Sequence, residues 1–519
     1  MYTTRYSWRD WLTAAALSIV MLLVTLANMT TGVPDWGDDH SAYISEAISI
    51  VDGTFDAQNQ LNPYLHPSVL PEEAKGEKLV YVWGYPLMLT PIYRAVGFDR
   101  ENFDDIWYYK IPSALCFSLL AGVMFLFFRR RLERLPSAGM ALLFYARMDM
   151  IHGVNNLYAD VAFLFFSMLL LLMMEVFVTH VSERGWGLFT ALFYGVTLWF
   201  TREVRLNGTT VCAVCLIGHA MAVITRQAPL NRRNAWRHAL PYLVMLALTL
   251  VSERLWLSPA TSNLSDLGRV SLRNTLSNGY HLVGSIYMFF DCMTGLRTYI
   301  FGLAALAVMA IGVLSDGFRR NLHLTLMLGG SILVVAMLPY FQGSRYIYNL
   351  MPLALMYAAY GARFIREWAK KRWPERRDAI RRAACALAAV LVCLSFVRVT
   401  VFSAHAFAER DKRDDKDMYS APAVDIYHYI QKNVPEDAII AFWKPRALYL
   451  NTQRKCFRGD TNHHSIEEPD FYLHIKTVEK SVEITEKIRP ALKLLYENEY
   501  FQFFKVDLTG LEIPPAKDT

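Results

Sequence analysis

Two adjacent carboxylates follow the first apolar run of the chain. The run WLTAAALSIVMLLVTLANM is followed by PDWGDDHSAY, in which Asp38, Asp39 and His40 are consecutive and Tyr43 ends the stretch. A carboxylate is a natural general base for the hydroxyl of a sugar or a lipid, and this position reaches a substrate whose tail stays in lipid. Asp is also among the best N-cap residues of a helix. From the residues alone both interpretations stay open, and one aspartate can fill both roles.

A third carboxylate lies at the start of a later apolar run. Asp160 stands in NNLYADVAFLFF, directly before the apolar residues. Ionisable residues at or within membrane spans are costly and are therefore candidates for function. Because Asp160 precedes the run, an N-cap role is the alternative.

Three basic residues lie in segments expected on the outer face of the membrane, where the positive-inside rule predicts few Lys and Arg. Arg345, followed by Tyr346, lies in the short turn YFQGSRYIYNLMP between two apolar runs, and Arg202 lies in WFTREVRLNG beside Glu203. A guanidinium fork binds phosphate through two parallel hydrogen bonds. A snorkelling arginine is the alternative for Arg345, and a local Arg–Glu pair is the alternative for Arg202. Lys78, in GEKLVYVW, is by default a solvated lysine.

Metal and nucleotide chemistry have little support in the sequence. His40 and His66 could join the acids around a divalent metal, but no His-x-x-x-His or paired Cys spacing supports such a site. The chain has no G-x-x-x-x-G-K-[ST], no G-x-G-x-x-G and no G-x-S-x-G motif. We therefore expect no cofactor, with a divalent metal as an unsupported possibility.

The elements that must position these residues are membrane helices. Of 519 residues, 54% are hydrophobic and only 19% are charged. The apolar residues gather in repeated runs, and about 20 residues suffice to cross a bilayer. The net charge of +6 comes from basic residues between these runs, as the positive-inside rule expects, and not from a stripe that would bind nucleic acid. The sequence predicts a polytopic α-helical protein in contact with membrane lipids.

About eleven spans place all the strongly basic linkers on one side of the membrane. This orientation puts the N-terminus in the cytoplasm, and puts the loop 30–111 and the tail 403–519 outside. The stretch 258–297 is also outer, although HLVGSIYMFF within it could be a re-entrant or additional helix. The expected domains are 1–402 in the membrane and 403–519 outside. The expected spans are about 11–29, 112–128, 137–150, 160–178, 187–200, 209–224, 239–257, 298–314, 322–340, 346–365 and 383–402.

The two outer segments have secondary-structure patterns of their own. In the loop, YISEAISIV predicts a helix that stops at Gly53, and VYVWGYPLMLTPIYRAVG predicts interfacial segments cut by Pro86 and Pro91. In the tail, PAVDIYHYIQKNV predicts a helix with Pro422 in its first turn, and DAIIAFW and YFQFFKVDL predict strands. TEKIRPALKLLYENE is expected to be partly helical. The tail is therefore predicted to be a small α/β domain.

The order of these motifs resembles the GT-C superfamily of integral-membrane glycosyltransferases. The family places an Asp-acid-x-x-Tyr motif in its first outer loop, and DHSAY matches it at Asp39 and Tyr43, with His40 where the second acid often stands. A register that begins at Asp38 is the alternative. Further matches fall on Lys78, Asp160, Arg202 and Arg345, and the pattern is similar to bacterial protein O-mannosyltransferases and lipid A aminoarabinose or galacturonic acid transferases.

The resemblance implies a reaction at the outer face of a bacterial inner membrane. The donor would be a polyprenyl-phosphate sugar and the acceptor a lipid, a glycan or a protein, as in lipopolysaccharide or protein glycosylation. Asp39 or Asp38 would act as general base in an inverting transfer, with Asp160 orienting a cation or the acceptor. Arg345, with Lys78 or Arg202, would stabilise the departing phosphate. A transporter or lipid flippase is the alternative, but we find no repeat of the kind that such proteins carry.

Overall fold

A computed structural model of the chain describes most of its residues. The predicted phosphate ligand Lys78 lies outside the described residues, as does His66. The described residues are 6–33, 36, 38–54, 82–145, 150–228, 230–255, 271–294, 299–317, 321–338, 343–409, 417–458, 469–476, 489–507 and 509.

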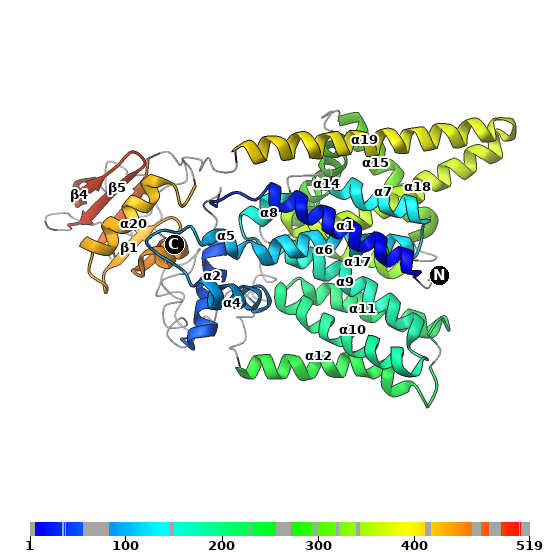
Figure 1. Cartoon of the computed structure of the whole chain (residues 1–519), viewed down its shortest axis with the longest axis horizontal. Coiled ribbons are helices and arrows are strands. Elements are labelled where there is room, and N and C mark those ends of the chain that lie inside the picture. Colours follow the sequence, from blue (N-terminus) through cyan, green and yellow to red (C-terminus); the bar gives the residue numbers. More distant parts are fainter. Residues whose placement is uncertain are drawn as a thin grey trace.

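A bundle of apolar helices forms the larger part of the molecule (Figure 1). Each of the eleven predicted segments overlaps one helix, and five of the described helices are long and apolar enough to cross a membrane. The helical, apolar character of the chain is confirmed, and the number of spans stays a prediction. The helices are α1 (Trp8–Ala27), α6 (Ile111–Arg129), α7 (Arg134–Tyr145), α9 (Ala159–His180), α10 (Arg184–Val204), α11 (Gly208–Ile224), α12 (Ala235–Leu255), α15 (Tyr299–Gly312), α17 (Leu322–Ala336), α18 (Met351–Arg372) and α19 (Arg377–Glu409).

One further helix lies in the stretch that was expected to be outer. HLVGSIYMFF belongs to α14 (Leu272–Thr294), a helix of 23 residues. It packs against α15 and α17. This segment is therefore helical, but α14 is not among the five described helices that are long and apolar enough to cross a membrane.

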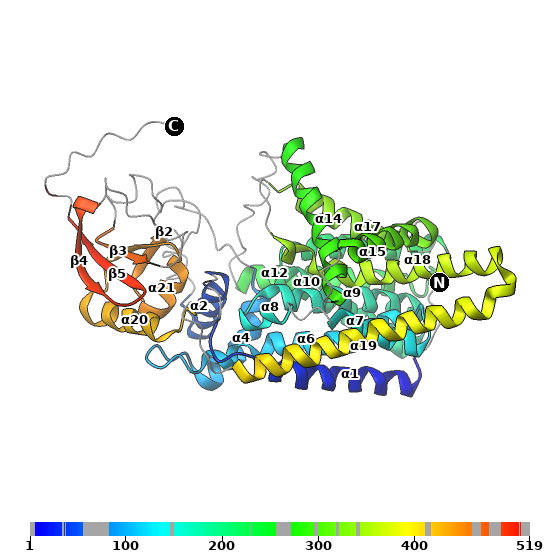
Figure 2. The same cartoon turned by 90° about the horizontal axis from the view of Figure 1, so that it is seen from above.

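Basic residues gather at the end of the bundle that points away from the C-terminal domain. The N-terminus and the turn between α18 and α19 both lie at this end (Figure 2). Here Arg129 and Arg134 each lie 3.0 Å from Asp10 of α1. Arg130 lies 3.1 Å from Glu175 of α9. These ion pairs tie α1, α6 and α9 together, and they satisfy carboxylates that would otherwise be buried without a partner.

Four short helices lie at the opposite end of the bundle, toward the C-terminal domain (Figure 1). They are α2 (Asp38–Asp52), α4 (Gly84–Val96), α5 (Ile106–Tyr109) and α8 (Ile151–Asn155). Gly53 follows α2 with a φ of +68°, which confirms the predicted stop. The expectation that two prolines cut the next segment is wrong. Pro86 stands in the first turn of α4, where its missing N–H is no loss, and Pro91 is accommodated inside the helix.

The described residues of the C-terminal tail form a five-stranded sheet with two helices, which agrees with the small α/β domain that was predicted. Its helices are α20 (Ala421–Asn433) and α21 (Pro445–Thr452), and the strand order is β2-β1-β3-β5-β4. The first three of these strands run parallel, and β5 pairs antiparallel with β3 and β4. Trp36, from the loop after α1, packs on Phe442 and Phe501 of this sheet and so helps to join the domain to the bundle. The strands are β1 (Ile439–Phe442), β2 (Lys455–Arg458), β3 (Phe471–Ile475), β4 (Leu492–Glu497) and β5 (Phe501–Val506).

One secondary-structure expectation in this domain is wrong. The segment TEKIRPALKLLYENE was expected to be partly helical, but its described residues form a single 3-10 turn, Arg489–Ala491, followed by strand β4. Leu and Glu favour helices when no other interaction competes. Here the antiparallel pairing of β4 with β5 satisfies the backbone, and this tertiary pairing outweighs local propensity.

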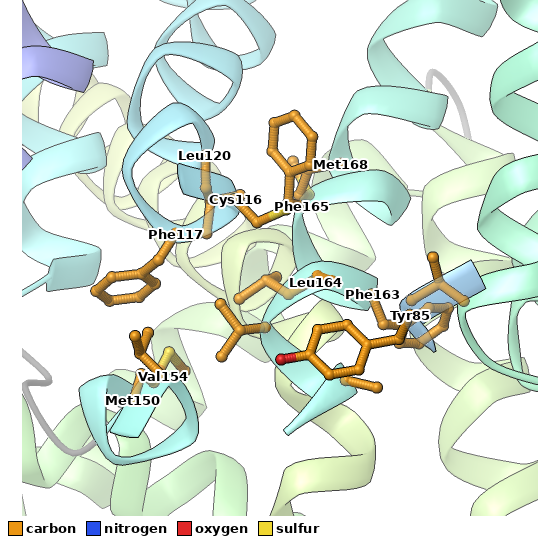
Figure 3. Close-up of a cluster of buried hydrophobic side chains, with 14 of the residues drawn as sticks. Tyr85, Cys116, Phe117, Leu120, Met150, Val154, Phe163, Leu164, Phe165 and Met168 are labelled. Atoms are coloured by element: carbon orange, nitrogen blue, oxygen red, sulfur yellow. The ribbon is translucent and has the colours of Figure 1, made fainter. Parts of the chain in front are cut away.

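A buried cluster anchors the helices beneath the C-terminal domain. Tyr85 of α4, Phe117 of α6, Val154 of α8 and Leu164 of α9 point into it (Figure 3), and each is at most 1% exposed. The Tyr85 hydroxyl is satisfied by Ser113 Oγ at 2.6 Å. The cluster therefore fixes α4 and α9, which carry residues discussed below, against one common core.

One carboxyl group in α2 is buried with little compensation. Glu46 is only 2% exposed, and its Oε2 has no hydrogen-bond partner among the described residues. Burial raises the pKa of Glu46 to about 8, and the nearby positive charge of Arg446 opposes that rise only in part. Near neutral pH the side chain is therefore mostly protonated.

Glu46 is expected to make stability depend on pH. Between about pH 4.5 and pH 8 the folded protein keeps a proton that the unfolded chain releases, so the free energy of unfolding falls as pH rises through that window. Glu46→Gln should remove this slope and raise the Tm above pH 8. Thermal unfolding in detergent at pH 5, 7 and 9 measures it, with the exposed Glu436→Gln as control. An unchanged slope in Glu46→Gln would contradict the burial argument.

Candidate active site

Asp39 and Arg345 form an ion pair although they are 306 residues apart in sequence. Arg345 Nη1 donates to Asp39 Oδ2 at 2.9 Å. Asp39 lies in the first turn of α2, and Arg345 lies in a 3-10 helix, η4 (Ser344–Leu350), directly before α18. The two side chains are 24% and 31% exposed, so both remain accessible. A carboxylate and a cation in contact at an accessible position can serve as a base and an anion-binding group.

Aromatic rings and a second carboxylate surround the Arg345 guanidinium. It lies 5.0 Å from the ring centroid of Tyr158 and 5.6 Å from that of Tyr346. Burial acts to lower the pKa of Arg345, but the negative charges of Asp39 and Asp160 outweigh it, and the net shift is upward. Arg345 therefore stays charged at any working pH, and the rings hold its planar group in one orientation.

A second ion pair lies next to the first. Asp160, in the first turn of α9 and 4% exposed, pairs with Arg205, the residue that follows α10. The guanidinium of Arg205 lies 4.5 Å from the ring centroid of Tyr346, the same ring that contacts Arg345. Two arginines and two aspartates are thus brought together around one tyrosine. A dianionic phosphate matches the two positive groups of such a cluster.

Tyr43 joins the same cluster from α2. It stands four residues after Asp39, one helical turn further on. Its side chain is 6% exposed, and its ring lies 5.0 Å from that of Tyr85 in an edge-on contact. Tyr43 also contributes to the electrostatic surroundings of both Arg345 and Arg205. Asp39 and Tyr43 therefore lie on one face of α2, with Asp39 in contact with Arg345 and Tyr43 near both arginines.

A glycine allows α4 to approach the end of α10 that precedes Arg205. A Cβ at Gly84 would lie 2.5 Å from the carbonyl carbon of Glu203, which real contacts do not allow. Any larger residue would push the two backbones apart. Gly84 thus helps to set the position of Arg205, two residues after Glu203.

Asp38 and His40 face away from this cluster. Asp38 is 7% exposed and accepts a hydrogen bond from the backbone N–H of Ala447 in α21, at 3.2 Å. His40 is fully buried, and its Nε2 lies 2.9 Å from Met418 Sδ and 3.2 Å from Ser41 Oγ. Successive residues on a helix point about 100° apart, so three consecutive side chains cannot share one face. The structure brings Asp39, and not Asp38 or His40, to Arg345.

Arg202 was predicted to bind phosphate, but the structure places it elsewhere. It lies 3.4 Å from Glu203 and 3.4 Å from Glu253 and donates to Thr249 at 3.0 Å, on α10 and α12. This is the local pairing that the sequence offered as an alternative. Arg205, three residues later, reaches the cluster instead. The sequence could have identified Arg205, because this residue lies in the same short basic segment as Arg202. It stands next to the turn residues LNG that follow the helix.

The described residues contain no group of three or more His, Cys, Asp or Glu side chains that could hold a metal ion. The acids of the cluster instead face arginines. The positions that the structure brings together are therefore Asp39, Tyr43, Asp160, Arg345 and Tyr346, with Arg205 and Tyr158 as additions that sequence reasoning missed.

Solved structures share this architecture over most of the chain. No family model matches the sequence, and no curated protein matches it. ArnT from Cupriavidus metallidurans bound to undecaprenyl phosphate aligns with a TM-score of 0.54 at 12% identity, over 96% of this chain and 98% of that one. Its apo form gives 0.56 at 12% identity, over 95% and 97%. The Archaeoglobus fulgidus oligosaccharyltransferase, tethered with an acceptor peptide containing the NVT sequon, gives 0.50 at 8% identity, over 89% and 69%.

Proposed function

Because the chain has the fold of GT-C glycosyltransferases, we propose that it is itself a membrane glycosyltransferase. It transfers a sugar from a polyprenyl-phosphate donor to a lipid, glycan or protein acceptor at the outer face of the membrane. The contact between Asp39 and Arg345, beside Arg205, is the observation that carries this proposal. The donor class is supported by undecaprenyl phosphate in the ArnT structure.

In the proposed reaction Asp39 is the general base. It takes the proton of the acceptor hydroxyl while the acceptor oxygen attacks the anomeric carbon from the face opposite the phosphate. The bond from that carbon to the phosphate oxygen breaks, and its electron pair leaves with the polyprenyl phosphate. The products are an inverted glycoside and polyprenyl phosphate, with the proton on Asp39.

The arginines stabilise the departing phosphate. Arg345 contacts Asp39 when no donor is bound, and an arriving phosphate competes for the same guanidinium, which releases the carboxylate for the acceptor. Arg205, held by Asp160, supplies the second positive charge. Preorganised cations of this kind stabilise charge that develops in the transition state. Lys78 stays a proposed third phosphate ligand.

Arg205 is expected to matter for transfer where Arg202 does not. Arg205→Gln should lower kcat/KM for the donor by about 10- to 100-fold, because a charge beside the phosphate is lost. Arg202→Gln, which changes only the pairing between α10 and α12, should stay within about twofold of the wild type. Steady-state kinetics of the two purified variants measures the difference. Equal losses in both variants would contradict the assignment of Arg205.

The proposed orientation places the site on the extracytoplasmic side of the membrane. The basic residues after α6 and between α18 and α19 lie at the end away from the site, where the positive-inside rule expects the cytoplasm (Figure 1). The C-terminal domain is then extracytoplasmic, and the bacterial inner membrane is the proposed location.

A deletion strain tests the function in the cell. Mass spectrometry of its glycolipids and glycoproteins should show one glycan feature missing, and the missing mass identifies both the sugar and the acceptor. The wild-type gene should restore that feature and an Asp39→Asn gene should not. Glycolipids and glycoproteins that do not change on deletion would contradict the proposal.

A further inference from the structure

Helix α21 of the C-terminal domain is held at both ends by the outer loop of the membrane domain. At its N-terminal end, the carboxylate of Asp38 accepts from the N–H of Ala447 at 3.2 Å. At its C-terminal end, Arg100 Nε donates to the carbonyl oxygen of Leu450 at 3.0 Å. A negative group at the first turn and a positive group at the last turn both complement the helix dipole. Both contacts are therefore electrostatically favourable, and together they attach the two ends of α21 to the outer loop.

Asp38 acts as the N-cap acceptor that helix α21 does not have in its own sequence. The residue at the N-cap position is Lys444, and within the described residues it makes no side-chain capping bond. Ala447 is the third residue of the helix, where an N-cap side chain normally accepts a hydrogen bond. Asp38, 409 residues away in sequence, supplies the acceptor instead. A cap of this type stabilises a helix, and here it also joins two domains.

The carboxyl groups of α2 at this interface face basic residues of α21. Asp38 and the protonated Glu46 lie near Arg446, which is 4% exposed, and Asp38 also lies near Lys444. Burial raises the pKa of Asp38, while Arg446 and Lys444 oppose the rise. Helix α21 thus packs against α2 through these residues.

Asp38 and Asp39 are neighbours in the first turn of α2, so a bond to one restrains the other. We propose that the C-terminal domain positions the catalytic carboxylate, with Asp38 as the positioning residue that fixes the rotation of α2 and thereby holds Asp39 against Arg345. This inference rests on the proposed function of Asp39. A displacement of about 1 Å at a reacting group can cost about 100-fold in rate, so such a restraint has a measurable effect.

The test compares Asp38→Ala, which removes the acceptor, with Asp38→Asn, whose amide oxygen can still accept from Ala447. Purified full-length protein is assayed with an undecaprenyl-phosphate monosaccharide that the wild type uses. Asp38→Ala should lower kcat by about 10- to 100-fold with the donor KM within about threefold, because the phosphate ligands are untouched. Asp38→Asn should recover kcat to within about threefold of the wild type.

Three kinetic results would each overturn this positioning role. A wild-type kcat in Asp38→Ala shows that the bond to α21 does not matter for the reaction. Loss of activity in Asp38→Asn as complete as in Asp39→Asn shows that the charge of Asp38 takes part in chemistry. If Asp38→Ala does not fold, Arg100→Gln frees the other end of α21, and a wild-type kcat there overturns the proposal as well.

Hydrogen exchange separates this inference from the proposed function. In Asp38→Ala the amides of residues 38–52 and of the first turn of α21 should exchange faster than in the wild type, whatever the substrate is. Unchanged exchange in both segments overturns the restraint even if transfer is confirmed. If the wild type transfers no sugar but Asp38→Ala still exchanges faster than the wild type, the restraint is supported. That result contradicts only the proposed function.

Discussion

Asp39→Asn is expected to abolish detectable sugar transfer, with kcat falling by about 100- to 10,000-fold, while the protein still folds. A positioned general base contributes about 10²- to 10⁴-fold to a rate. Asparagine has the same shape as aspartate and can still accept the hydrogen bond from Arg345, so the substitution removes the base and leaves the contact. The Tm in detergent should therefore stay close to that of the wild type.

The measurement is transfer by purified Asp39→Asn in lipid nanodiscs, with Asp52→Asn as a matched control. Asp52 lies at the far end of α2, is exposed and accepts a hydrogen bond from Tyr93 at 3.0 Å. Its substitution should leave kcat within about twofold of the wild type. If Asp39→Asn were as active as Asp52→Asn, Asp39 would have no part in the mechanism.

Arg345→Ala is expected to have the second largest effect, with kcat/KM for the donor falling by about 100- to 1,000-fold. In the proposed reaction the guanidinium binds the phosphate both in the bound donor and in the departing group, so KM should rise and kcat should fall together. Arg345→Lys keeps the charge but loses the planar fork and its contacts with Tyr158 and Tyr346, so it should recover only part of the loss.

Binding of undecaprenyl phosphate, measured by native mass spectrometry, separates the two roles of Arg345. The product should bind the wild type and Asp39→Asn, and should bind Arg345→Ala much more weakly. Arg363→Gln, an exposed change further along α18 and away from the site, is the control and should bind as the wild type does. Product binding by Arg345→Ala that equals this control would remove Arg345 from phosphate recognition.

The helices were predictable because hydrophobic length is a strong signal. A run of apolar residues must form a helix in lipid, where the backbone has no water to bond, and each of the eleven predicted segments overlaps one. The tail was harder, because β4 is built from residues such as Leu and Glu that favour helices. Its conformation depends on pairing with β5, a long-range contact that local sequence does not contain.

The candidate site was predictable in its residue types and less so in its partners. Asp39, Asp160 and Arg345 were identified because charges beside apolar runs are costly. The sequence could not decide between Asp38 and Asp39, because that depends on which face of α2 meets α21. It also named Arg202 and missed Arg205, since only the end of α10, where the chain becomes extended, turns Arg205 toward Asp160.

The release of polyprenyl phosphate tests the central claim most directly. Wild-type protein and Asp39→Asn, reconstituted in proteoliposomes, are incubated with a panel of undecaprenyl-phosphate monosaccharides and an envelope extract of the deletion strain as acceptor. Chromatography with mass spectrometry follows the free undecaprenyl phosphate. The proposed function predicts release from at least one donor by the wild type, matched by an equal amount of glycosylated acceptor, and none above background by Asp39→Asn. Equal release by both proteins, or no release by the wild type from any donor, would contradict it.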